Sequence, residues 1–144
     1  MSYVSKSLLP GERVTHETHL HKMMFSGPLL AALASIGLAF ASPPAGGGLF
    51  VIALPWALAV WIRYVSSEFA VTDKRVMIKI GLLHRRTLEM LLIKVEAISV
   101  DQSIAGRIFG YGTIVVVGTG GTREAFENIA SPLEFRRAVQ AATT

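Results

Sequence analysis

Cysteine is absent from this chain of 144 residues. Its absence excludes disulfide bonds, thiolate metal sites and a cysteine nucleophile, and it is consistent with a reducing cytoplasm. The sequence also lacks a catalytic constellation, because the acidic residues are spread singly and lie opposite basic ones in the predicted strands. No base or nucleophile has a positioned partner. We therefore expect a protein that is not an enzyme and that has no catalytic residue, cofactor or metal ion.

Charge is missing from residues 23–62, which contain no Asp, Glu, Lys or Arg. Such a run must be helical in lipid, because hydrocarbon offers no partner for a free backbone N–H or C=O. The prolines and glycines of residues 42–48 predict where the helix stops. We expect membrane helices over about 23–41 and 47–64, joined by an extracytoplasmic turn over 42–46. The second helix is a little short for a hydrocarbon core of about 30 Å.

A signal peptide and a soluble helical hairpin both compete with a membrane hairpin. A cleaved signal peptide is disfavoured, because the apolar region begins only after Lys22 and a second apolar segment follows it. A helical hairpin in a soluble core would carry polar positions every few residues on one face. Neither arm has such a face, so the membrane hairpin is the preferred interpretation.

Basic residues flank the apolar run, whereas the connecting turn carries none. Three basic residues precede the first helix, and Arg63 closes the second. By the positive-inside rule, both termini face the cytoplasm. The chain then divides into a cytoplasmic N-terminal arm (1–22), a transmembrane hairpin (23–64) and a cytoplasmic domain (65–144).

The first membrane helix carries a stripe of small residues at Gly27, Ala31, Ala34 and Ser35. Small residues allow helix backbones to approach closely in lipid. We expect this stripe to mediate helix packing.

From residue 68 onward the apolar pattern changes to period two, which is typical of strands. Strands are predicted over residues 68–72, 76–80, 85–90, 93–100, 113–117 and 122–129. The fourth of these requires a bulge or a bend near Ala97 to keep its apolar residues on one face. A further short strand is predicted after the Pro10-Gly11 turn, where it would join the sheet of the domain.

Residues 101–112 fit neither a strand nor a long helix. We expect a helical turn there, with Ile104, Ile108 and Phe109 as its buried residues.

The chain ends with a predicted helix whose start is well marked. Ser131 is a capping residue, Pro132 suits the first helical position, and Glu134 completes a capping box. The apolar face of this helix is expected to cover an open end or face of the sheet.

A basic group follows the second membrane helix and comprises Lys74, Arg75, Lys79, His84, Arg85, Arg86 and Lys94. One interpretation is positive-inside charge on solvated turns. The other is that Lys74, Arg75, Arg85 and Arg86 contact headgroups of anionic lipid, since each juxtamembrane basic residue contributes about 1 kcal/mol near an anionic surface. Nucleic acid is disfavoured, because no aromatic residues are interleaved with the basic ones.

Three histidines, His16, His19 and His21, lie in the N-terminal arm. Their spacing matches no closed metal site, and only Glu17 lies close as a carboxylate. A partly solvated role near lipid headgroups is favoured over metal binding.

Several segments resemble the membrane-anchored bacterial pleckstrin-homology (PH) domain proteins: Pro10-Gly11-Glu12, EFAVTDKRV at 68–76, GLL at 81–83, QSIAGRIFGYGTI at 102–114 and ASPLE at 130–134. The resemblance implies a membrane hairpin plus an α+β domain in the bacterial inner membrane. The domain would be a PH-like, partly open barrel or sandwich of seven antiparallel strands, capped by the C-terminal helix. Periodicity predicts about six strands after the hairpin, so the seventh is expected from the N-terminal arm or from a different division of residues 82–92.

We therefore expect a non-enzymatic inner-membrane scaffold or interaction protein. Its PH-like domain would mediate self-assembly or bind another membrane protein, through exposed strand edges. An anionic-lipid headgroup sensor acting through the basic hairpins is the leading alternative, and a regulatory subunit of a membrane enzyme complex is the second.

Overall fold

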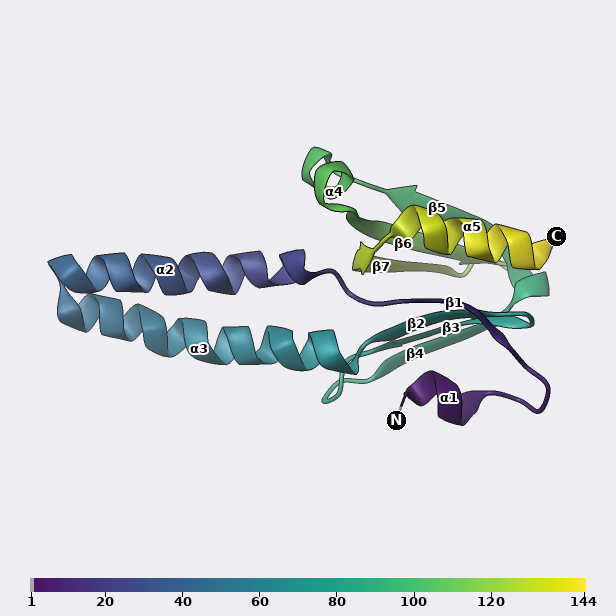
Figure 1. The fold of residues 1–144 in the computed structure, drawn as a ribbon, viewed down its shortest axis with the longest axis horizontal. Helices are drawn as coiled ribbons and strands as arrows, with labels where there is room; N and C mark the ends of the chain where they lie inside the picture. The colour runs from purple at the N-terminus through teal and green to yellow at the C-terminus, as the bar shows by residue number, and fades with distance from the viewer. Residues whose placement is uncertain (1) are drawn as a thin grey trace.

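The computed structural model describes residues 2–144 and has two parts, a long helical hairpin and an α+β domain (Figure 1). The hairpin consists of α2 (Ser26–Ala41) and α3 (Pro43–Ser66), with the 3-10 turn η1 (Lys22–Phe25) before it. One antiparallel sheet contains β1 (Val14–Thr18), β2 (Glu68–Thr72), β3 (Arg75–Ile80) and β4 (Arg86–Leu91). The other contains β5 (Val95–Asp101), β6 (Tyr111–Gly118) and β7 (Arg123–Ala130). The remaining elements are α1 (Tyr3–Ser7), η2 (Leu92–Lys94), α4 (Ile104–Phe109) and α5 (Pro132–Thr143).

The N-terminal arm supplies the seventh strand, which confirms the expectation that it joins the sheet. β1 pairs with β2, and the residues that follow β1 pair with β7. The Ala130 N–H donates to the His19 carbonyl at 2.9 Å, and the Thr18 hydroxyl donates to the Ala130 carbonyl at 2.6 Å. The arm therefore closes the two sheets into a barrel on one side. On the other side η2 connects β4 to β5, and within residues 2–144 these two strands share no ladder.

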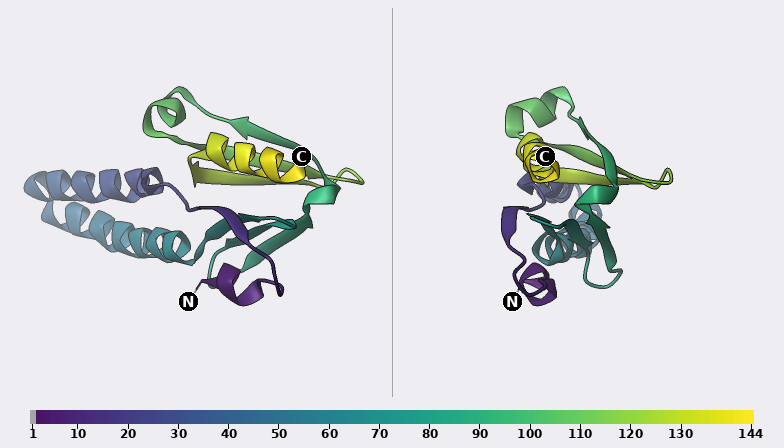
Figure 2. Two further views of the ribbon diagram at one scale, coloured as in Figure 1. Left: turned by 45° about the vertical axis from the view of Figure 1, so that its right-hand side comes forward. Right: turned by 90° about the vertical axis from the view of Figure 1, so that its right-hand side faces the viewer.

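The core lies between the sheets, where alternate strand residues meet. Its largest fully buried side chains include Phe69, Phe126, Ile114 and Ile129. The helix α5 packs against β1, β2, β5 and β6 (Figure 2) and contributes Phe135, which is fully buried. The predicted bulge also exists, as a register shift between Val95 and Ala97. These features confirm the expected PH-like arrangement of antiparallel strands capped by a C-terminal helix.

The predicted capping box at the start of α5 is wrong. Ser131 adopts a left-handed conformation (φ +50°), and its side chain makes no capping hydrogen bond. Its backbone N–H instead donates to the Gly110 carbonyl at 2.9 Å. Pro132 takes the first helical position as predicted. Tertiary pairing with the end of α4 thus replaces the local cap.

The outer face of the first sheet is covered by α1, which the sequence did not predict. Val4 packs there, and both Ala70 and Met77 are fully buried although they point away from the main core. The Glu68 carboxylate accepts hydrogen bonds from the backbone N–H groups of Tyr3 (3.0 Å) and Val4 (3.1 Å) at the start of α1. Burial raises the pKa of Glu68. The hydrogen bond from the Ser2 hydroxyl, those from the two N–H groups and the charge of Lys79 outweigh burial and hold the pKa below its usual value. The carboxylate therefore anchors the first turn of α1.

A buried ion pair between Glu12 and Arg75 fastens the rest of the arm. The Arg75 Nε donates to Glu12 Oε1, and its Nη2 donates to Glu12 Oε2, both at 3.0 Å. Leu9 N–H and the Thr72 hydroxyl also donate to this carboxylate. Burial raises the pKa of Glu12, yet the hydrogen bonds and the charge of Arg75 lower it to about 2. The Pro10-Gly11-Glu12 motif therefore has a packing role, in which Gly11 (φ +80°) turns the chain and Glu12 receives Arg75.

The connection between the membrane-type helices is shorter than predicted. Helix α3 begins at Pro43, so only Ser42 separates it from α2, and a turn over 42–46 is wrong. Prolines are tolerated in the first turn of a helix because the N–H groups there have no helical partner. Gly46 permits the close return, since a Cβ there would lie 2.5 Å from the Ala39 backbone. With 24 residues at about 1.5 Å each, α3 is about 36 Å long and is not short.

Three of the four stripe residues, Gly27, Ala31 and Ser35, lie on the side of α2 that packs against α3. A Cβ on Gly27 would lie 2.9 Å from the Trp56 ring, and Ser35 is buried. Ala31 is half-buried between them, whereas Ala34 is exposed on another face. The stripe thus follows i, i+4, i+8 spacing within one hairpin.

The buried residues predicted for the helical turn are wrong. The turn exists as α4, but Ile104, Ile108 and Phe109 are 81%, 73% and 54% exposed. The face that packs on the domain is made by Gly106, where a Cβ would lie 2.6 Å from the Tyr111 carbonyl oxygen. Close backbone contact leaves no room for large side chains, so these point outward.

Candidate functional site: a cavity at the base of the hairpin

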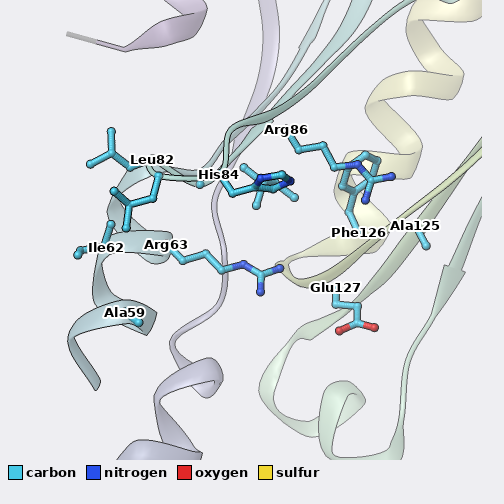
Figure 3. A pocket seen from close by; sticks show the side chains of 12 residues that line it. Ala59, Ile62, Arg63, Leu82, His84, Arg86, Ala125, Phe126 and Glu127 are labelled. Atoms are coloured by element: carbon cyan, nitrogen blue, oxygen red, sulfur yellow. The ribbon is translucent and has the colours of Figure 1, made fainter. Parts of the chain in front are cut away.

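A cavity of about 520 Å³ lies where the hairpin meets the domain. One wall is the last part of α3, another is the end of β3 with the loop to β4, and the third is the middle of β7. Figure 3 shows the side chains that line it. The lining residues are Ala59, Ile62, Arg63, Ile80, Gly81, Leu82, Leu83, His84, Arg86, Ala125, Phe126 and Glu127.

A glycine turn brings the β3–β4 loop against the end of α3. Gly81 has φ +80°, and a Cβ there would lie 2.5 Å from the His84 carbonyl oxygen, so the turn requires glycine. The Gly81 N–H points at the Ser67 hydroxyl at 3.4 Å, and that hydroxyl donates to the Arg63 carbonyl at 2.6 Å. This chain of contacts fixes Leu82, Leu83 and His84 beside the last turn of α3.

The polar lining of the cavity is mainly basic. Arg63, His84 and Arg86 are set against a single carboxylate, Glu127. Figure 3 shows the Arg63 guanidinium reaching from α3 toward the β7 side, below His84. The walls between these groups are aliphatic or aromatic. The cavity therefore combines positive charge with an apolar surface.

The two arginines of the cavity differ in whether they form an ion pair. Arg86 forms an ion pair with Glu124, and its guanidinium lies 5.7 Å from the centre of the Phe126 ring. Among residues 2–144, none of the ion pairs includes Arg63. Arg63 thus holds a guanidinium available for an anion, while Arg86 is partly neutralised and helps to form the wall.

The four predicted headgroup residues fall into two separate places. Lys74 and Arg75 lie at the β2–β3 turn, at the end of the domain away from the hairpin, whereas Arg85 and Arg86 lie by the β3–β4 loop next to it (Figure 1). Arg86 lines the cavity, and Arg85 is its exposed neighbour. Arg75 donates to Glu12, to Glu89 and to the Ser7 carbonyl. The headgroup role of the four stays a prediction, and Arg75 has a distinct structural role.

Sequence reasoning used Arg63 only to set topology and did not connect it with β7. Arg63 and Glu127 are 64 positions apart by their numbers, and no short-range pattern links them. The sequence offered one signal for this site, which is the pair Leu82 and Leu83 in a predicted hairpin turn, where apolar residues are unusual. In the structure both leucines are exposed.

The histidines of the N-terminal arm lie apart from the cavity. His21 accepts a hydrogen bond from the Met23 N–H at 3.1 Å and stacks on Tyr111 at 5.2 Å. His16 faces Phe135 edge-on, and His19 is exposed. Within residues 2–144 no three His, Cys, Asp or Glu side chains form a group suited to a metal ion. His21 therefore has a structural role at the entry to the hairpin.

Comparison with known proteins gives one family. Residues 28–143 match the family model described as "Bacterial PH domain". The matched segment includes most of the hairpin, all of the strands that follow it and the C-terminal helix. No curated protein and no solved structure gives a significant match.

Proposed function

Because the chain belongs to the bacterial PH domain family, whose members are interaction or lipid-binding modules, we propose that it is a membrane-anchored, non-catalytic lipid-binding protein. Its ligand is the headgroup of an anionic phospholipid, which binds in the cavity at the base of the hairpin. The observation that carries the proposal is the Arg63 guanidinium at the end of α3. It lies beside apolar walls and forms no ion pair with any of residues 2–144.

The hairpin supports the membrane part of the proposal. Two spans, Lys22–Ala41 and Pro43–Ser66, are long and apolar enough to cross a bilayer, with mean hydropathy of 1.8 and 1.9. Only 11% of the apolar 18-residue window of each span is buried, whereas a core helix of a soluble protein would be mostly covered. We place the N-terminal arm (1–22) and the PH-like domain (65–144) at the cytoplasmic face of the bacterial inner membrane, with the hairpin (23–64) spanning it.

The position and chemistry of the cavity support the lipid part. Arg63 lies in the last turn of α3, which is the level of the headgroups if α3 spans the bilayer. A guanidinium matches a phosphate with paired, charge-assisted hydrogen bonds. Ala59 and Ile62 continue the apolar wall along α3 toward the acyl chains, and the volume lies within the usual range for small-molecule sites. A headgroup with its upper acyl segments satisfies both surfaces.

Replacing Arg63 with glutamine is expected to weaken anionic phospholipid binding about tenfold or more, because a charge-assisted hydrogen bond is worth about 1.5–3 kcal/mol. Native mass spectrometry of the full chain released from detergent measures how many phosphatidylglycerol and phosphatidylcholine molecules remain bound. Lys22→Gln is the matched control, since Lys22 is a basic residue beside the hairpin that does not line the cavity. Equal retention of phosphatidylglycerol by the wild type and both variants would contradict the proposal.

A second candidate, self-assembly, is favoured by the open side of the barrel. There Leu91 and Ile93 are 48% and 85% exposed beside the unpaired edge of β4. Exposed edge strands are templates for pairing with another chain. A discrete oligomer after gentle detergent extraction, lost on replacing Ile93 with lysine, would support this scaffold role alongside lipid binding.

A further inference from the structure

Helix α4 presents three large apolar side chains to its surroundings. Ile104 and Ile108 are each more than 70% exposed, and Phe109 is about half exposed. Arg107 stands among them and is also exposed. Interfacial membrane helices combine such apolar side chains with basic ones. In water, most of the apolar surface of this helix would be exposed to solvent.

This helix lies at the end of the domain from which the hairpin projects. Figures 1 and 2 agree in placing α4 beside the start of α2 along the long axis of the molecule. Contacts give the same position, because Tyr111, two residues after α4, stacks on His21 at 5.2 Å. His21 directly precedes η1, which leads into α2. The apolar side chains of α4 are therefore near the plane at which the hairpin enters lipid.

Hydrogen bonds at both ends of α4 fix the helix to the domain. The Ser103 hydroxyl caps it by accepting from the Gly106 N–H at 3.1 Å, and Gly110 ends it in a left-handed conformation. The Gln102 side chain donates to the Tyr111 carbonyl at 3.0 Å. These contacts fix the outward direction of the apolar side chains.

We propose that α4 is an interfacial wedge that inserts Ile104, Ile108 and Phe109 into the boundary between headgroups and acyl chains. Arg107 lies at the depth of the lipid phosphates. The inference rests on the proposed membrane insertion of the hairpin. The bilayer is the occupant because α4 lies at the end of the domain from which the apolar hairpin projects, and because its basic residue suits an anionic surface. The wedge would hold the domain in one orientation, with the mouth of the cavity at the lipid surface.

The natural absence of cysteine allows a direct depth measurement. Single cysteines at Ile108, at Leu33 in the middle of α2, and at Thr122 in the distal β6–β7 turn are spin-labelled in the full chain. Each variant is reconstituted into vesicles of phosphatidylcholine and phosphatidylglycerol. Relaxation by oxygen, which concentrates in lipid, is compared with relaxation by a water-soluble nickel chelate.

The Ile108 label is expected to be relaxed more by oxygen than by the nickel chelate. The ratio should be larger still for the Leu33 label, and it should be reversed for the Thr122 label. A nickel-accessible label at Ile108 with an immersed Leu33 would overturn the wedge and leave the membrane hairpin intact. Shielding from both reagents would also overturn it, because it would show a protein partner or a second copy at this face. A nickel-accessible Leu33 would instead contradict the proposed membrane insertion itself.

Discussion

Replacing Arg75 with methionine is expected to lower the free energy of opening of the N-terminal arm and the first sheet by about 3–5 kcal/mol. The change leaves the Glu12 carboxylate buried without its counter-ion. It also removes the hydrogen bonds to Glu89 and to the Ser7 carbonyl. Hydrogen exchange of peptides from β1, β2 and β3 in the detergent-solubilised full chain measures this free energy.

Lys74→Met is the matched control for this prediction. Lys74 is the preceding residue and is exposed, so its replacement is expected to change the free energy of opening by less than about 0.5 kcal/mol. The double variant Glu12→Gln, Arg75→Met is expected to recover part of the loss, because no buried charge then lacks a partner. Equal exchange in Arg75→Met and Lys74→Met would show that the ion pair does not hold the arm.

Replacing Gly46 with alanine is expected to destabilise the packing of α2 against α3 by about 1–3 kcal/mol. The new methyl group would lie 2.5 Å from the backbone of Ala39, and a backbone cannot rotate away as a side chain can. Thermal unfolding in mild detergent, followed through Trp56 in a Trp61→Phe background, measures the effect because the Trp56 ring lies against Gly27.

The neighbouring Gly47 provides the control. A Cβ at Gly47 meets no atom within 4 Å, so Gly47→Ala is expected to be neutral or to stabilise the helix by about 0.5 kcal/mol. If Gly46→Ala unfolded at the same temperature as Gly47→Ala, the close return of the hairpin at Ser42 would be contradicted.

The sequence predicted elements whose signals are local. The alternation at 68–80 gave the β2–β3 hairpin, and the uncharged run gave two long helices. The bulge near Ala97 followed from the alternation of apolar residues, which changes face at this point of the strand. Each of these depends on the spacing of residues within one segment, which a sequence displays directly.

Predictions failed where a distant partner decided the outcome. α4 has the apolar content of a buried turn, but the close approach of Gly106 to Tyr111 turns its bulk outward. The β2 strand runs about 16 Å away from the hairpin at about 3.3 Å per residue, which carries Lys74 and Arg75 away from the membrane end. No short-range pattern predicts that α1 covers the sheet or that Arg63 and β7 line one cavity. A site assembled from α3, the β3–β4 loop and β7 becomes visible only in the fold.

Photocrosslinking from the rim of the cavity tests the central claim, which is that an anionic phospholipid binds there. Benzoylphenylalanine replaces Leu83, which lines the cavity and is 92% exposed, in the full chain reconstituted with phosphatidylglycerol and phosphatidylcholine. Mass spectrometry after irradiation is expected to show an adduct mainly with phosphatidylglycerol, and Arg63→Gln is expected to suppress it. Adducts formed equally with both lipids and unaffected by Arg63→Gln, or adducts only with protein, would contradict the account.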